Sequence, residues 1–201
     1  MTTDPPGSVA GVLLAAGSSV RMGRNKLLFA FNGETIVRRA ARQALAVLDP
    51  VVVVLGHEPD RIRVELAGLP CLTTVNLDHA RGIHASVRAG LAALPPEVEA
   101  AVVLLADMPL VTSAMIAQVV DRYRRSGAPL VISQYGDAIA PPHLYARSLF
   151  ADLAQAEGCG KQVIRRHRAE AAVLSWPDAA LTDLDVPADR DRVEALLATE
   201  S

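Results

Sequence analysis

The stretch that decides the fold is VAGVLLAAGSSVRMGRNK, residues 9–26. Its first part is an almost unbroken apolar run, which is typical of a strand buried on both faces of a parallel sheet. Gly17 then permits a backbone turn, and a strand that runs into such a small-residue loop directs several backbone N–H groups at one spot. Arg21 and Lys26 add positive charge nearby in the sequence. The segment therefore predicts a binding site for an anion such as a phosphate.

Two better-known phosphate-binding loops do not fit, because neither Gly-Lys-Ser/Thr at P-loop spacing nor Gly-x-Gly-x-x-Gly occurs here. The segment resembles instead the signature Leu-Ala-Ala-Gly-x-Ser-x-Arg-Met-Gly-x-x-Lys of the MobA-like nucleotidyltransferases. This resemblance implies that Arg21 and Lys26 hold a triphosphate and serve catalysis. Because Lys26 lies in a loop at the edge of the predicted sheet, we expect its ammonium to be solvated when no ligand is bound. The alternative is a strand followed by a basic surface turn. The matching residues are Leu14, Ala15, Ala16, Gly17, Ser18, Arg21, Met22, Gly23 and Lys26, and all but Met22 and Gly23 are candidates for nucleotide binding.

Length and composition favour one α/β domain. The chain has 201 residues, of which 51% are hydrophobic and only 3% aromatic, so Ala, Val and Leu must fill the core. We expect a disordered tail over residues 1–8 and a single NTP-transferase domain over 9–200. A formal charge of −2 gives no general attraction to nucleic acid or to an anionic membrane. The two cysteines lack metal-site spacing, and no leader or long apolar span is present, so we expect a cytoplasmic protein.

Apolar runs and amphipathic segments alternate along the chain, which indicates a doubly wound sheet. The resemblance implies a three-layer Rossmann-like nucleotidyltransferase fold, with a mostly parallel central sheet and helices on both faces. The segment 171–174 is a candidate for a last central strand. The expected strands are 9–14, 51–55, 72–75, 101–105, 128–133 and 171–174, with a short partner strand at 138–140, and the expected helices are 34–48, 59–67 and 112–125 with a final helix to about 199.

A second informative stretch runs from Asn76 to Gly90. It resembles the family segment Asn…Gly-Met-x-x-Ser-Leu-x-x-Gly, which implies that Asn76, Gly82 and Ser86 lie against the nucleotide. Gly56, where the strand 51–55 stops, is a further candidate for the nucleotide site. For Ser86 the alternative is that it only caps a helix. His79 and His84 have no assigned role.

Asp107 follows the apolar run at 101–105, at the strand end where ligands of open α/β sheets bind. A carboxylate there suits Mg²⁺, which prefers carboxylate and phosphate oxygens. The Asp-Met-Pro sequence resembles that of the family, which implies a metal-ligand and catalytic role for Asp107; the alternative is that it caps the next helix. Asp183 and Asp185 are two residues apart, so on an extended strand their side chains would point to the same face and could share a ligand. By resemblance one of them completes the metal site, and we favour Asp185.

The segment expected to bind the acceptor matches the family's motif only in part. PPHLYARSLF, residues 141–150, resembles the family's Pro-x-Leu-Phe-x-Arg-x-Leu-Phe, which implies that Pro142 borders the acceptor, although the usual glycines before this proline are absent. Lys161 stands near a helix start and is a candidate for holding a substrate phosphate. The alternative is a basic surface helix that continues through Arg165, Arg166 and Arg168.

The resemblance implies a Mg²⁺-dependent enzyme that transfers CMP from CTP to a phosphorylated acceptor and releases pyrophosphate. Molybdopterin is the favoured acceptor, and a molybdoenzyme or its maturation factor is a further expected partner. The Ala15-Ala16-Gly17 form of the signature resembles cytidylyltransferases, whereas guanylyltransferases usually carry Ala-Gly-Gly. Two alternatives stay open. One is guanylyl or cytidylyl transfer to another small acceptor, such as a sugar phosphate or a phospho-acid, and the other is a nucleotide-binding module without turnover.

Overall fold

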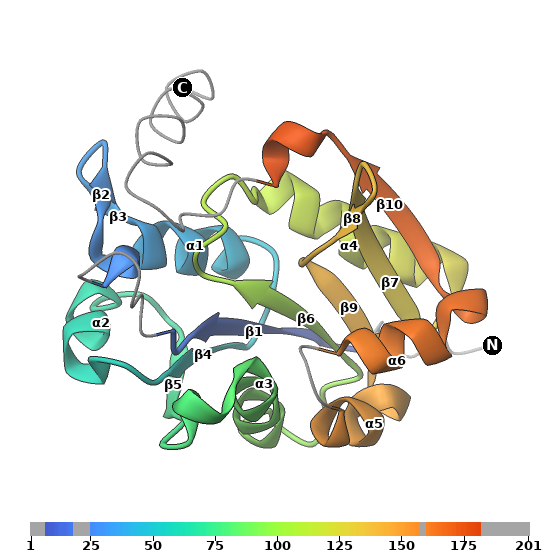
Figure 1. Cartoon of the computed structure of the whole chain (residues 1–201), viewed down its shortest axis with the longest axis horizontal. Helices are drawn as coiled ribbons and strands as arrows, with labels where there is room; N and C mark the ends of the chain where they lie inside the picture. The colour runs from blue at the N-terminus through green and yellow to red at the C-terminus, as the bar shows by residue number, and fades with distance from the viewer. Residues whose placement is uncertain (1–6, 18–24, 157–159, 182–201) are drawn as a thin grey trace.

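A central sheet organises the protein (Figure 1). The structure, a computed structural model, describes residues 7–17, 25–156 and 160–181. Within these residues the sheet has eight strands in the order β10-β7-β9-β6-β1-β4-β5, with β8 paired to β7. The strands are β1 Val9–Ala15, β4 Val51–Leu55, β5 Leu72–Val75, β6 Ala100–Leu105, β7 Leu130–Tyr135, β8 Ala138–Ile139, β9 His143–Ala146 and β10 Ala172–Trp176.

The sheet is mostly parallel, as the sequence predicts. The strands β6, β1, β4 and β5 run parallel to one another, and β10 runs parallel to β7. The exception is β9, which lies between β6 and β7 and is antiparallel to both. The strand predicted at 171–174 is present as β10, but its central position is wrong: in the described part of the chain β10 pairs with β7 alone and forms an edge.

Helices cover both faces of the sheet and give the predicted three layers (Figure 1). One hydrophobic core lies under α1 Ile36–Leu45, α2 Pro59–Glu65 and α4 Ser113–Ser126. The other lies under α3 Ile83–Ala92, α5 Phe150–Gln155 and α6 Lys161–Arg166. In β1, Leu13 and Ala15 belong to the first core and Val12 and Leu14 to the second, as the two-residue period of a strand requires. None of the described helices has the length and apolarity needed to cross a membrane.

Local sequence explains where α1 and α4 begin. The helix expected over 34–48 begins only at Ile36, because Glu34–Thr35 form β3, which pairs with β2 Ala30–Phe31 in a small hairpin. The turn of this hairpin, Asn32-Gly33, has positive φ at both residues. Helix α4 begins after Thr112, whose Oγ1 accepts a hydrogen bond from the N–H of Met115 at 3.2 Å and so caps the helix.

Candidate functional site

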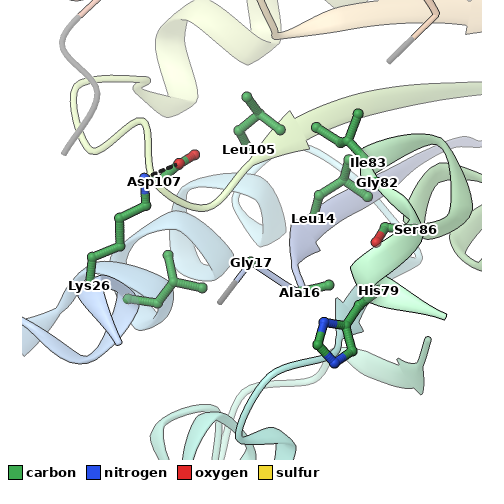
Figure 2. Close-up of a pocket in the computed structure, with 11 residues that line it drawn as sticks. Leu14, Ala16, Gly17, Lys26, His79, Gly82, Ile83, Ser86, Leu105 and Asp107 are labelled. Atoms are coloured by element: carbon green, nitrogen blue, oxygen red, sulfur yellow. Dashed lines mark ion pairs between the residues drawn. The ribbon is translucent and has the colours of Figure 1, made fainter. Parts of the chain in front are cut away.

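A cavity of about 190 Å³ opens where the carboxyl ends of β1 and β6 meet (Figure 2). These two parallel strands are neighbours, with Leu14 opposite Leu105, so the residues that follow them meet at one edge of the sheet. The 3₁₀ turns η2 Lys26–Leu28 and η3 His79–Arg81 and the start of α3 close the remaining sides. The lining residues are Leu14, Ala16, Gly17, Lys26, Leu27, His79, Gly82, Ile83, Ser86, Leu105 and Asp107.

Lys26 and Asp107, which both line the cavity, form an ion pair. Lys26 Nζ lies 2.6 Å from Asp107 Oδ2, and the two side chains are only 12% and 26% exposed. Asn25 holds the start of η2, because its buried Oδ1 accepts the N–H of Leu27 at 3.2 Å. The expectation of a solvated lysine is therefore wrong: the turn brings its ammonium to the carboxylate at the end of β6. The cap of α4 is Thr112, so the alternative that Asp107 caps this helix is wrong as well.

Asn76 and Ser86 act together on the opposite wall. Asn76 leaves β5 with its N–H donating to the Leu55 carbonyl at 2.8 Å, and its Nδ2 donates to Ser86 Oγ at 3.0 Å. Helix α3 has Gly82 as its N-cap and begins at Ile83, so Ser86 is an interior residue rather than a cap. Its hydroxyl lines the cavity, whereas buried Asn76 positions that hydroxyl from behind.

Gly56 lets two cavity segments approach each other. A Cβ at this position would lie 2.7 Å from the Cβ and the carbonyl oxygen of Ala16 and 2.7 Å from the Cβ of His79. Real Cβ atoms do not tolerate such distances, so only glycine fits without a shift. Gly56 thus borders the site without lining it. The imidazole of His79 lines the cavity, and its centroid lies 6.5 Å from that of His57.

The structure brings most of the predicted nucleotide-site residues together. Leu14, Ala16, Gly17, Lys26, Gly82, Ser86 and Asp107 share the cavity, whereas the side chain of Ala15 packs into the core under α1. The sequence motifs assign no role to His79, Leu27, Ile83 or Leu105, all of which line the cavity. The position of His79, three residues before Gly82 in the second motif, could have revealed it. Ser18, Arg21, Asp183 and Asp185 lie outside the described residues.

A second cavity of about 700 Å³ adjoins the first at Leu105, which lines both. Lys161 lines it together with Arg165 and with Arg168 of η5 Arg168–Glu170. Arg166 instead pairs with Asp152, at 2.8 Å between Nη1 and Oδ2. The lining residues are Leu105, Asp137, Ile139, Ala140, Pro141, His143, Lys161, Ile164, Arg165 and Arg168.

Pro142 supports this cavity from outside. Its carbonyl accepts the hydroxyl of Ser133 at 2.6 Å, and the carbonyl of Pro141 accepts the hydroxyl of Tyr135 at 2.9 Å. The next residue, His143, is 3% exposed and lines the cavity. Burial lowers the pKa of His143 to about 3, and the carbonyl of Pro142 opposes this effect only in part. Its imidazole is therefore neutral.

The donor set at the first cavity fits a magnesium ion that arrives with a nucleotide. Among the described residues no three His, Cys, Asp or Glu side chains gather into a metal cluster. Mg²⁺ is commonly held by one or two protein carboxylates together with substrate phosphates and water, and Asp107 offers one carboxylate beside the cavity. In this structure the ammonium of Lys26 lies against that carboxylate, so the site already accommodates one cation.

Residues 11–173 match the MobA-like NTP transferase domain. The chain belongs to this family of nucleotidyltransferases. The match spans β1 to β10 and so includes both cavities.

Curated relatives and solved structures are similar to this chain over most of its length. The bifunctional protein GlmU of Kineococcus radiotolerans is 32% identical over 154 residues, which are 74% of this chain and 31% of that protein. The chain thus spans about a third of the length of the curated relatives it matches. Rv0371c of Mycobacterium tuberculosis, solved in complex with manganese, is 25% identical with a TM-score of 0.77, covering 94% of this chain and 98% of that one. A nucleotidyl transferase of Methanothermobacter, 19% identical with a TM-score of 0.83, covers 96% and 99% and shares the fold.

Proposed function

We propose that the protein transfers CMP from CTP to a phosphorylated acceptor, with molybdopterin as the favoured acceptor, and releases pyrophosphate. The observation that carries this proposal is the pair of adjoining cavities. The first contains Lys26 and Asp107 at the carboxyl ends of two parallel strands, and the second has a wall of three basic side chains. One cavity therefore suits a nucleoside triphosphate and the other an anionic acceptor.

In the proposed reaction an oxygen of the acceptor phosphate attacks the α-phosphorus of CTP. The bond from that phosphorus to the bridging oxygen of the β-phosphate breaks, and pyrophosphate leaves with the electron pair. The acceptor oxygen is already ionised, so no residue has to remove a proton from it. Such chemistry depends on alignment and charge neutralisation more than on covalent participation by the protein.

Different residues would bind the triphosphate, the metal ion and the acceptor. Lys26 and Arg21 hold the triphosphate and neutralise its charge, and the loop at Gly17 offers backbone N–H groups to it. Asp107, with Asp185 as the second proposed ligand, would hold Mg²⁺, which supplies further neutralisation at the phosphates. Lys161 and Pro142 belong to the acceptor side. The manganese complex of Rv0371c supports a divalent metal in this family.

The preference for CTP rests on Ala16. Its side chain lines the first cavity and its Cβ lies against Gly56, so it fills space that a glycine at this position would leave open. A smaller cavity favours a pyrimidine over a purine. This agrees with the resemblance of Ala15-Ala16-Gly17 to cytidylyltransferases.

The test is a nucleotide and acceptor panel. We would measure the melting temperature with each of the four ribonucleoside triphosphates and Mg²⁺, and pyrophosphate release with molybdopterin, glucose 1-phosphate or 2-phospholactate as acceptor. CTP should rank first and molybdopterin should support turnover. A preference for GTP by roughly tenfold would contradict the base assignment. Binding of CTP without release of pyrophosphate with any acceptor would favour a nucleotide-binding module, and mass spectrometry of co-purified ligands would then identify the molecule it binds.

A further inference from the structure

Asp107 lies in the loop that joins β6 to α4, and the backbone on either side of it is held in place. The N–H of Ala106 donates to the carbonyl of Leu14 at 3.0 Å, which continues the pairing of β6 with β1. The next residue along, Met108, is 2% exposed and belongs to the core under α1. The loop is therefore packed against the sheet and α1, while Asp107 lines the first cavity.

Two side chains of α1 hold the rest of this loop. Arg39 Nε donates to the carbonyl oxygen of Pro109 at 3.0 Å. Gln43 Oε1 accepts the N–H of Ser113, the first residue of α4, at 2.7 Å. Arg39 and Gln43 are four residues apart, so they lie on the same face of α1. Each bond joins residues that are 70 positions apart in the chain, and together they fix the loop against α1.

The bond from Arg39 acts close to Asp107. Pro109 is a buried residue two positions after Asp107, and buried carbonyl groups are almost always hydrogen-bonded. The guanidinium is a charged donor, and hydrogen bonds from charged groups are roughly twice as strong as those between neutral groups. Without this donor the carbonyl would lose its bond to α1, and the loop would be free to move at a point next to the carboxylate.

Helix α1 also holds the segment that contains Lys26. The N–H of Phe29 donates to the carbonyl of Lys26 at 3.1 Å, and the N–H of Ile36, the first residue of α1, donates to the carbonyl of Phe29 at 3.0 Å. The helix is thus bonded both to the turn that presents the ammonium and to the loop that presents the carboxylate. These bonds explain how Lys26 Nζ comes to lie 2.6 Å from Asp107 Oδ2 (Figure 2).

We propose that Arg39 is a positioning residue for the transfer reaction: by holding the carbonyl of Pro109, it keeps the carboxylate of Asp107 where it meets Lys26 and a metal ion that arrives with the nucleotide. Gln43 holds the other end of the same loop. Arg39 and Gln43 are not among the described residues that line either cavity, so both act through the backbone. This inference rests on the proposed function, which makes Asp107 a metal ligand.

Two neighbouring arginines of α1 provide the test and its matched control. Arg39→Met keeps most of the aliphatic stem and removes the donor to Pro109. Arg38→Met is the control, because Arg38 Nη1 donates to the carbonyls of Glu65 and Ala67 at 2.7 and 3.0 Å and lines neither cavity. Both variants remove hydrogen bonds from an arginine to backbone carbonyls, so a purely structural role would give similar effects. Arg39→Gln is the conservative variant, since its amide nitrogen takes the place of Nε in the side chain and can still donate.

The lysine ammonium groups show in the ligand-free protein whether the carboxylate is in place. The chain has two lysines, Lys26 and Lys161, and Lys161 is exposed. In protein labelled with ¹⁵N at Nζ, the NMR signal of Lys26, identified by its absence from Lys26→Met, should shift or disappear in Arg39→Met. The signal should stay in place in Arg38→Met and in Arg39→Gln. Gln43→Met, which releases the other end of the loop, should shift it as well, and decides the outcome if Arg39→Met does not fold.

Catalysis should follow the same order. A displacement of about 1 Å at a distance from the chemistry can slow an enzyme by about 10²-fold, so Arg39→Met should lower kcat by at least ~10-fold with CTP, Mg²⁺ and molybdopterin. The KM for CTP should stay within about threefold, because Lys26 and the loop at Gly17 still hold the triphosphate. Binding of Mn²⁺ in the presence of an unreactive CTP analogue, measured by electron paramagnetic resonance, should weaken by about tenfold. Arg39→Gln should stay within about threefold of the wild type in all three quantities.

An unshifted Lys26 signal in Arg39→Met would overturn the inference, as would effects of equal size in Arg38→Met. A shifted signal with unchanged kcat and Mn²⁺ binding would also contradict it. A wild type that releases no pyrophosphate contradicts the proposed function instead, and the Lys26 signal then still decides whether Arg39 holds Asp107 in place.

Discussion

Replacing Lys26 by alanine should reduce stability slightly and catalysis strongly. The substitution removes an ammonium that lies 2.6 Å from Asp107 Oδ2 and leaves that carboxylate without this partner at a site where it is only 26% exposed. Exposed ion pairs contribute about 0–1 kcal/mol, and breaking a fully buried pair costs about 3–5 kcal/mol. For this partly buried pair we expect a loss of about 1–2 kcal/mol in the free energy of unfolding. That corresponds to a fall of about 3–6 °C in melting temperature for a domain of this size.

The catalytic loss should be larger than the loss of stability. A charge-assisted contact to the triphosphate is strongest as pyrophosphate leaves, so the rate of transfer should fall by at least ~10²-fold, which is about 2.7 kcal/mol. Scanning calorimetry measures the first quantity, and pyrophosphate release at saturating CTP measures the second. Lys26→Met retains most of the aliphatic stem without the charge and should reproduce both losses.

Two further variants test whether the effects are specific to the pair of Lys26 and Asp107. Arg63→Ala breaks the exposed pair with Asp60 on α2, far from the chemistry, and should change the free energy of unfolding by no more than about 0.5 kcal/mol and leave the rate unchanged. In an Asp107→Asn background, Lys26→Ala should cost less stability than in the wild type, because no carboxylate is left without its ammonium. A Lys26→Ala protein that melts a few degrees lower and still transfers CMP at the wild-type rate would refute the role of Lys26 at the triphosphate.

Substitutions at Gly56, Ser86 and His143 should each change stability in a measurable way. Gly56→Ala should lower the free energy of unfolding by about 1–3 kcal/mol and weaken CTP binding, since its Cβ would lie 2.7 Å from Ala16 atoms; urea unfolding and CTP titration check both, and an unchanged protein would contradict the close contact. Ser86→Ala leaves the buried Nδ2 of Asn76 without its acceptor and should cost about 1–3 kcal/mol, whereas Ser86→Thr, which keeps the hydroxyl, should cost less. The folded pKa of His143 lies below its unfolded value, so the unfolded chain binds the extra proton as pH falls, and stability is lost from about pH 6.5 downward. Between pH 7 and pH 5 His143→Gln should therefore lose about 2 kcal/mol less stability than the wild type in urea unfolding, and equal losses would contradict a buried neutral ring.

The sheet could be predicted from the sequence because its strands are short apolar runs bounded by turn residues. Val51–Leu55 is fully buried and matches its predicted bounds, and the glycine loop after β1 lies at the cavity as expected. The edge position of β10 and the insertion of β9 between β6 and β7 could not be predicted, because the strand order depends on pairing between segments that are far apart in the sequence.

In the candidate site, too, residues within local motifs could be predicted, but contacts between distant segments could not. Gly17, Lys26, Gly82, Ser86 and Asp107 were found because each stands in a motif with fixed spacing. The pairing of Lys26 with Asp107 joins residues 81 positions apart in the chain, and no local pattern predicts such a contact. The hydrogen bond from the Ser133 N–H on β7 to Nδ1 of His143 on β9 likewise joins two strands, and the sequence does not reveal it.

The most direct test of the central claim is to follow the α-phosphorus of CTP. CTP labelled at this phosphorus is incubated with Mg²⁺, molybdopterin and either the wild type or Asp107→Asn, and the products are separated and weighed by mass spectrometry. We predict that the wild type moves the label into a molybdopterin product heavier by one CMP residue, with one pyrophosphate released for each, and that Asp107→Asn forms it at least ~10²-fold more slowly. Label that stays in CTP or appears as free CMP, or an Asp107→Asn protein that forms the product at the wild-type rate, would contradict it.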